Sequence, residues 1–294
     1  MAFTCCSGKV KPERLLASKS RGFRKTKKMD MNKRYINKLV KICKSRVIGR
    51  CAKIKKDPVI VLGNQKSGTT AIAALLAEFG GLSATLDIPD AKGFLKLIKK
   101  EITFDKLVKR NQYYFSKDIL KEPSLTFFCD DLMRHFTRAK ILFIIRDPRD
   151  NIRSILNRVN IRGNLIDIKP ETFLQIKKSW QYAIDCTWLG LRKGTYIEML
   201  AERWNYAADV YLANYDKMIL VRYEDFLKDK LFAIRILASK LLIDFKNDIS
   251  DKLDIQYQPK GDRDISWKQF FGKENLRKIE FICESRMKRL GYLL

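Results

Sequence analysis

The sequence predicts an α/β fold in which a central, mostly parallel sheet is flanked by helices. Short apolar runs recur at 58–62, 118–121, 140–146 and 217–222, and such runs are typical of buried parallel strands. Between them, apolar residues recur with the spacing of amphipathic helices. An alternation of strands and helices indicates a parallel sheet that is covered on both faces.

Composition narrows the class of protein. Hydrophobic residues make up 46% of the 294 residues, so the chain can bury a substantial core. Its seven cysteines are scattered and odd in number, which favours a reducing compartment over a disulfide framework or a zinc site. With one histidine, a transition-metal site is not expected. No run approaches the roughly 18 apolar residues of a membrane span, and no secretory signal is evident, so we expect a cytoplasmic protein.

The formal net charge of +27 is concentrated near the N-terminus. Residues 1–57 hold 19 Lys and Arg against three acids, a net +16. We expect residues 1–56 to form a basic extension, a tail followed by an amphipathic helix at 31–50, ahead of a folded domain at 57–294. Such an excess fits either a solvated arm or attraction to an anionic membrane surface, a nucleic acid or a polyanionic substrate.

The folded domain is predicted to begin with a strand, a glycine loop and a helix. The strand is the apolar run at 58–62, and the polar loop GNQKSG follows at 63–68. The helix at 69–79 places Ile72, Leu75, Leu76 and Phe79 on one face. Two consecutive glycines at 80–81 then end it.

The remaining elements continue the alternation. A short strand at 118–121 and a helix at 124–137 precede the strongest strand, KILFIIR at 140–146. Asp147 is a suitable N-cap and Pro148 a suitable first-turn residue for a helix at 149–158. The fourth strand, at 217–222, is followed by Tyr223, Glu224 and Asp225, which we interpret as architectural, with an acid capping the next helix. Further helices are expected at about 90–111, 171–188, 195–214, 229–242 and 274–290.

The glycine loop has the chemistry of an anion site. A glycine-rich turn between a buried strand and a helix offers backbone N–H groups and the positive end of a helix, and phosphate is the usual occupant. The two glycines have the spacing of a Walker A motif, and Thr69 and Thr70 supply hydroxyls. The lysine, however, precedes the second glycine as Lys66, and the next strong strand ends in Arg146 rather than a metal-binding carboxylate. We therefore expect a P-loop-like three-layer fold that binds phosphate without a metal.

Arg146 and Ser154 form a second candidate anion site. Arg146 stands at the carboxyl end of its strand, where open α/β sheets bind ligands. Ser154 lies on the following helix and can face the same side, so that an arginine and a hydroxyl could grip a phosphate. The alternative is a helix N-cap beside a surface arginine.

Taken together, the two motifs resemble the sulfotransferases that use 3′-phosphoadenosine 5′-phosphosulfate (PAPS). The matching segments are KSGTT at 66–70 and RDPRDNIRS at 146–154, supported by LKEP at 120–123, RW at 203–204 and VRYEDF at 221–226. Gln65 and Ala71 stand where the cytosolic phenol and steroid branch has proline and tryptophan. The chain thus looks more like the carbohydrate- and protein-modifying branch and its bacterial relatives.

The resemblance implies metal-independent, in-line transfer of a sulfuryl group from PAPS to an acceptor hydroxyl or amine, releasing adenosine 3′,5′-bisphosphate. It implies that Lys66 contacts the 5′-phosphosulfate and stabilises charge on the bridging oxygen. Arg146 and Ser154 would hold the 3′-phosphate. A late basic loop would add Lys260 and Arg263. The same resemblance places around the 5′-phosphosulfate the loop residues Gln65, Ser67, Gly68, Thr69 and Thr70.

The resemblance also implies that a carboxylate activates the acceptor. Asp87 lies nearest the expected place, with Asp90 and Glu122 as alternatives, although Asp87 and Asp90 could equally cap a helix. Lys121 is a candidate second catalytic lysine that faces the sulfate, or else a surface lysine at a strand end. The single histidine, His135, is expected on a helix away from the ligand-binding end of the strands.

The acceptor expected from the resemblance is carbohydrate-like, and the positive charge is consistent with an anionic one. A small natural product is an alternative acceptor. Two functions of other classes stay open at this stage: a P-loop nucleotide kinase, and a non-enzymatic basic protein that binds polyanions. No recognition signature for a specific nucleic acid is present.

Overall fold

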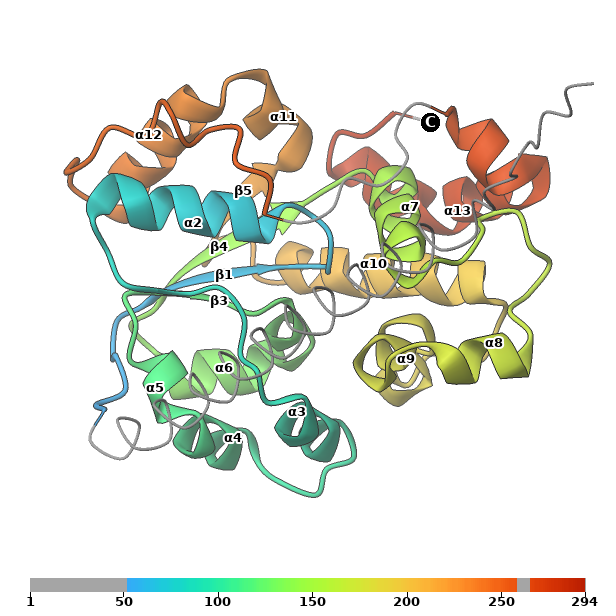
Figure 1. Ribbon diagram of the computed structural model, residues 1–294, viewed down its shortest axis with the longest axis horizontal. Helices are drawn as coiled ribbons and strands as arrows, with labels where there is room; N and C mark the ends of the chain where they lie inside the picture. The colour runs from blue at the N-terminus through green and yellow to red at the C-terminus, as the bar shows by residue number, and fades with distance from the viewer. Residues whose placement is uncertain (1–51, 258–264, 294) are drawn as a thin grey trace, which may run out of the picture. The chain divides into compact units, whose positions relative to one another are not determined.

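The computed structural model describes residues 52–257 and 265–293 of the chain. Its centre is a parallel sheet of five strands in the order β2-β3-β1-β4-β5 (Figure 1). All four neighbouring pairs run parallel, which confirms the predicted fold class. The strands are β1 (Val59–Gly63), β2 (Ala84–Thr85), β3 (Ile119–Lys121), β4 (Lys140–Ile145) and β5 (Met218–Arg222).

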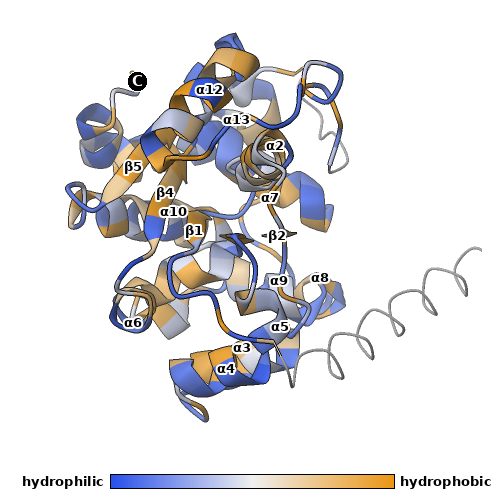
Figure 2. Ribbon diagram, turned by 90° about the vertical axis from the view of Figure 1, so that its left-hand side faces the viewer, coloured by the Kyte–Doolittle hydropathy of each residue, from blue (hydrophilic) through white to orange (hydrophobic). Residues whose placement is uncertain are grey.

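Helices cover both faces of the sheet. On one face, α2 (Thr69–Gly80) packs against α12 (Lys230–Leu241), and α11 (Tyr223–Lys228) connects β5 to α12. Figure 2 shows α2 and α12 on one side of the sheet and α6 on the other. The other helices are α3 (Ala91–Ile98), α4 (Phe104–Arg110), α5 (Gln112–Phe115), α6 (Cys129–His135), α7 (Pro148–Val159), α8 (Pro170–Gln175), α9 (Lys178–Ile184), α10 (Tyr196–Leu212) and α13 (Trp267–Arg289).

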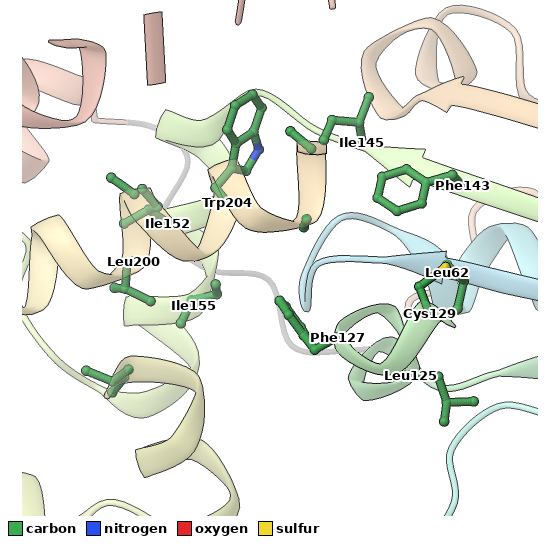
Figure 3. Packing of buried hydrophobic residues seen from close by; sticks show 14 of the residues in the cluster. Leu62, Leu125, Phe127, Cys129, Phe143, Ile145, Ile152, Ile155, Leu200 and Trp204 are labelled. Carbon is green, nitrogen blue, oxygen red and sulfur yellow. The ribbon is translucent and has the colours of Figure 1, made fainter. Parts of the chain in front are cut away.

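The core on the second face joins the sheet to α7, α10 and α13. Figure 3 shows Ile152 and Ile155 of α7 beside Leu200 and Trp204 of α10. Trp204 is fully buried, and its indole N–H donates to the carbonyl oxygen of Arg146 at 2.8 Å. This contact joins the middle of α10 to the end of β4, so the core directly positions the strand end that carries Arg146.

Several helices are shorter than the sequence pattern predicts. The helix expected at 90–111 divides into α3 and α4, because Thr103 caps a second helix after Lys100 adopts a positive φ of 59°. The segment expected at 124–137 begins as a 3-10 helix, η1 (Pro123–Phe128), before α6. The segment at 171–188 divides into α8, α9 and a 3-10 turn, η2 (Thr187–Leu189).

The last helix starts earlier than predicted. A capping box between Ser266 and Gln269 begins α13 at Trp267, and the helix kinks at Gly272. The strand β2 was not predicted, because two residues give no readable alternation.

Four sequence predictions lie outside the described residues: the N-terminal tail, the helix at 31–50, Lys260 and Arg263. Within 52–257 and 265–293, no helix is long and apolar enough to cross a membrane.

Candidate active site

The loop after β1 has the backbone of an anion-binding turn. Gly63 has a φ of 137°, and a Cβ there would lie 2.3 Å from the carbonyl oxygen of Ile144. Lys66 and Gly68 also adopt positive φ values, of 70° and 93°. No side chain caps the N-terminus of α2 at Gly68. The first N–H groups of α2 and its positive end therefore face the loop, as an anion site requires.

Two neighbouring elements hold this loop in place. The Thr126 hydroxyl of η1 accepts from Gly63 N–H at 2.9 Å and donates to the carbonyl oxygen of Gly63 at 3.1 Å. On the other side, the Tyr223 ring lies so close to Gly68 that a Cβ at this position would meet it at 2.2 Å. Glycine at 68 is therefore required both by its conformation and by the contact with Tyr223.

A buried amide network lies beneath the loop. The Asn64 amide donates to the side-chain oxygen of Asn151 at 2.9 Å. The Asn151 amide in turn donates to the Gln65 carbonyl oxygen at 2.9 Å and to the Ser67 hydroxyl at 3.0 Å. Arg203 reaches the same loop from α10, and donates to the side-chain oxygens of Gln65 at 2.6 Å and Asn64 at 3.2 Å. These hydrogen bonds therefore hold the conformation of the loop without a bound ligand.

The sequence places Asn151 and Arg203 in segments that resemble the family, but it gave no role to them or to Asn64. One signal could have pointed to Arg203: it sits among apolar and small residues on the buried face of α10, where a charged residue needs a specific reason. Asn151 carries no such signal, because a polar residue in the first turn of a helix is ordinary.

The structure brings Arg146 to the loop. Arg146 is buried at the end of β4, and its guanidinium donates to the Lys66 carbonyl oxygen at 3.2 Å. The same guanidinium lies 5.0 Å above the Tyr223 ring and 3.7 Å from the Asp150 carboxylate on α7. Ser154 is one turn beyond Asp150 on this helix, so it shares the face that points toward Arg146.

The start of α7 follows the predicted capping. Asp147 accepts from Arg149 N–H at 2.9 Å as the N-cap, and Pro148 occupies the first turn. Glu224 accepts from Asp147 N–H at 2.9 Å and from the Tyr292 hydroxyl at 2.9 Å. Residues 223–225 belong to α11, and the helix that follows, α12, is capped by Asp229, which accepts from Phe232 N–H at 2.9 Å. The prediction that an acid of 223–225 caps that helix is therefore wrong.

Asp87 and Lys121 meet at the same edge of the sheet. Their ammonium nitrogen and carboxylate oxygen are 2.8 Å apart. The Lys121 side chain is 3% exposed, whereas that of Asp87 is 67% exposed. Lys121 ends β3 opposite Val61, two residues before the loop begins at Gly63. Of the two interpretations of Lys121, the structure therefore rejects the surface lysine.

The other candidate acids have structural roles. Asp90 caps α3, accepting from Gly93 N–H at 3.0 Å, and pairs with Arg110. The Glu122 carboxylate accepts from Ile88 N–H at 3.0 Å and Ser124 N–H at 3.1 Å. Burial raises the pKa of Glu122, which those hydrogen bonds only partly offset.

His135 lies on α6, before β4 begins, where its ring nitrogen is 2.6 Å from the Asp105 carboxylate. It therefore takes no part in the cluster at the loop, as the sequence predicts.

Comparison with known proteins decides the family. A sequence model that describes the sulfotransferase domain family matches residues 56–260 of the chain. The chain belongs to the sulfotransferase domain family. Sulfotransferase STF9 from Mycobacterium avium has a similar solved structure, with a TM-score of 0.50, 13% identity, and coverage of 85% of this chain and 81% of that one. This likeness confirms the fold of this sulfotransferase.

A solved structure of mouse sulfotransferase SULT7A1 complexed with PAP is also similar, with a TM-score of 0.46, 16% identity, and coverage of 81% of this chain and 86% of that one. A search of curated protein sequences found no match. The sulfotransferase has no group of His, Cys, Asp and Glu that could hold a metal ion in the part of the chain that the structure describes.

Proposed function

We propose that this sulfotransferase transfers a sulfuryl group from PAPS to an acceptor hydroxyl or amine by in-line displacement. The observation that carries the proposal is the joining of three features at one edge of the sheet. These are the uncapped N-terminus of α2, the loop with Lys66, and Arg146 in contact with that loop. N–H, ammonium and guanidinium groups suit a donor with several anionic groups.

In this proposal the loop binds the 5′-phosphosulfate. PAPS supplies an electrophilic sulfur and a leaving group that departs as adenosine 3′,5′-bisphosphate. Lys66 places a positive charge where the leaving oxygen gains negative charge, and the N–H groups that begin α2 stabilise the same charge. Gln65, Ser67, Thr69 and Thr70 complete the cradle. Arg146 and Ser154 hold the 3′-phosphate, since Ser154 lies one helical turn beyond Asp150, whose carboxylate is 3.7 Å from the Arg146 guanidinium.

Asp87 is the proposed general base. Its carboxylate is mostly exposed and pairs with Lys121 at the end of β3, so it can accept a proton from the acceptor as the acceptor attacks sulfur. Asp90 and Glu122 are less suitable, because backbone N–H groups and arginine already occupy their oxygens. Lys121 holds the Asp87 carboxylate in place and adds positive charge beside the sulfuryl group.

The proposed acceptor is carbohydrate-like and anionic. The helices α3 and α4 follow Asp87 in the chain and present cations to solvent. The exposed cations of these helices and of the turn between them are Lys92, Lys96, Lys99, Lys100, Lys106, Lys109 and Arg110, the last of which pairs with Asp90. A positive surface that begins beside the base would attract a polyanionic chain or a sulfated or carboxylated sugar. The basic extension at 1–56, ahead of a catalytic domain at 57–294, would add to the attraction of an anionic surface.

Calorimetric titration tests the proposal. We expect adenosine 3′,5′-bisphosphate to bind without Mg²⁺, and the double variant Lys66→Ala, Arg146→Ala to lose binding. Arg134→Ala is the matched control, since Arg134 is an exposed cation paired with Asp131 on α6. ATP binding that requires Mg²⁺ and exceeds that of the bisphosphate would instead identify a nucleotide kinase. Binding of neither nucleotide would favour a protein that binds polyanions without catalysis.

A further inference from the structure

Arg203 is a buried cation directly beneath the glycine loop. Arg203 is 2% exposed, and residues one turn away on α10, namely Met199, Leu200 and Ala207, are also buried. The guanidinium lies 3.8 Å from the centre of the Phe127 ring. Burying a charged group in this way is costly unless an opposite charge compensates for it.

The partners of Arg203 are all uncharged. Its nitrogens donate to the side-chain oxygens of Gln65 and Asn64 and to the Cys186 sulfur, which is 3.7 Å away. Burial raises the pKa of the Cys186 thiol, so this group is neutral at pH 7. Among the described residues, no carboxylate forms an ion pair with Arg203. The protein therefore maintains a positive charge here without an internal counter-charge.

Folding alone gives a weak reason for this arginine. The oxygen of Asn64 that Arg203 contacts also accepts from Gln65 N–H at 3.0 Å, so it would keep a partner without Arg203. Gln65 is only partly buried, so its side chain could turn to water. An apolar side chain of similar length would fill the space at a lower desolvation cost.

We propose that Arg203 is a positioning residue that orients the Gln65 and Asn64 side chains of the loop and whose charge is balanced by the anion bound there. The inference rests on the proposed function, because it takes the 5′-phosphosulfate as that anion. Arg203 does not touch the donor in this arrangement; it acts through Gln65 and through its field in a region of low dielectric.

The test compares Arg203→Met, Arg203→Lys and the wild type in two measurements. Thermal unfolding of the free protein reports stability, and calorimetry with adenosine 3′,5′-bisphosphate reports affinity. We expect Arg203→Met to unfold at or above the wild-type temperature, while its Kd for the bisphosphate rises about tenfold or more, as loss of a charge-assisted interaction predicts. Arg203→Lys keeps the charge without the two-pronged geometry, so its Kd should lie between the two.

A second pair of variants keeps the test decisive if Arg203→Met fails to fold. Gln65→Glu supplies an internal carboxylate for Arg203, whereas Gln65→Met removes the contact without adding charge. We expect Gln65→Glu to unfold at a higher temperature and to bind the bisphosphate more weakly than Gln65→Met. The control Arg286→Met, which breaks the ion pair with Asp209 between α13 and α10, should leave the Kd unchanged.

The outcomes separate the two proposals. A wild type that does not bind the bisphosphate overturns the proposed function and this inference with it. A wild type that binds, with an equal Kd in Arg203→Met, overturns only the role of Arg203. If Gln65→Glu and Gln65→Met bind the bisphosphate with equal affinity, the proposed role of the Arg203 charge is likewise overturned.

Discussion

Replacing Asp87 separates its proposed catalytic role from its structural one. Asp87→Asn removes the proton acceptor but keeps a side-chain oxygen of the same length for Lys121, whose ammonium is now 2.8 Å from the carboxylate. Asp87→Ala removes both. Because the Lys121 side chain is 3% exposed, the alanine variant leaves a buried ammonium without its partner.

The expected magnitudes differ accordingly. We expect Asp87→Asn to reduce the free energy of unfolding by less than about 1 kcal/mol, since the amide oxygen can still accept a hydrogen bond from the Lys121 ammonium in place of an ion pair that is exposed on one side. Asp87→Ala should cost about 1–3 kcal/mol, the usual penalty for an unsatisfied buried group. Both variants should lower kcat by about 10²–10⁴, the range for loss of a general base.

Three assays check these values: urea unfolding, calorimetry with adenosine 3′,5′-bisphosphate, and bisphosphate release from PAPS with an acceptor found by screening glycans and small hydroxyl compounds. Affinity for the bisphosphate should not change, because the proposed function assigns Asp87 to the acceptor rather than to the bisphosphate. Asp105→Asn, at an exposed acid paired with His135, is the control. A kcat of Asp87→Asn within about threefold of wild type would refute the assignment of the base.

Three further predictions concern the frame of the site. Gly68→Ala should destabilise the protein by about 2 kcal/mol or more, because a positive φ is unfavourable for alanine and its Cβ would displace the Tyr223 ring. Thermal unfolding measures this effect, and an unchanged unfolding temperature would contradict the close approach of Tyr223 to Gly68. Thr126→Val removes two hydrogen bonds to the first glycine of the loop, so it should lower the free energy of unfolding in urea by about 1–3 kcal/mol. An unchanged free energy of unfolding would show that the loop does not depend on η1. Burial raises the pKa of Asp118, but hydrogen bonds led by that from Lys55 outweigh it and lower the pKa from 3.8 to about 2. The stabilisation of the folded protein by the ionised Asp118 is therefore complete above about pH 4 and disappears as the pH falls through about 2. Asp118→Asn should lower the free energy of unfolding by about 1 kcal/mol at pH 7, a value discounted for the partly exposed pair, and by progressively less between pH 4 and pH 2. A difference in unfolding free energy between the variant and the wild type that does not depend on pH would refute the argument.

The strands and the loop could be read from the sequence because each depends on local chemistry. Runs such as 140–146 are apolar on both faces only when a strand is buried on both faces. The glycines at 63 and 68 mark turns that other residues cannot form. Capping by Asp147 was predictable for the same reason, since the cap and its N–H partner are two residues apart.

Helix boundaries and long-range partners were less accessible. The division of 90–111 depends on Thr103 as a second cap within a pattern that a single helix could also satisfy. An acid of 223–225 was expected to cap the following helix, yet Glu224 binds Asp147 and Tyr292, which are 77 and 68 positions away. Local pattern cannot rank such contacts, because they exist only after the sheet has formed.

By itself the sequence determined the parallel α/β class, the glycine loop and most of the candidate site residues, although not Asn64, Asn151 or Arg203. Only the tertiary structure decided which of them act together. It paired Asp87 with Lys121, assigned Asp90 and Glu122 to backbone hydrogen bonds, and placed Arg203 beneath the loop. The physical reason is that burial and charge compensation depend on neighbours brought together from distant strands and helices, and these set the energy of an ionisable group more than its own sequence context does.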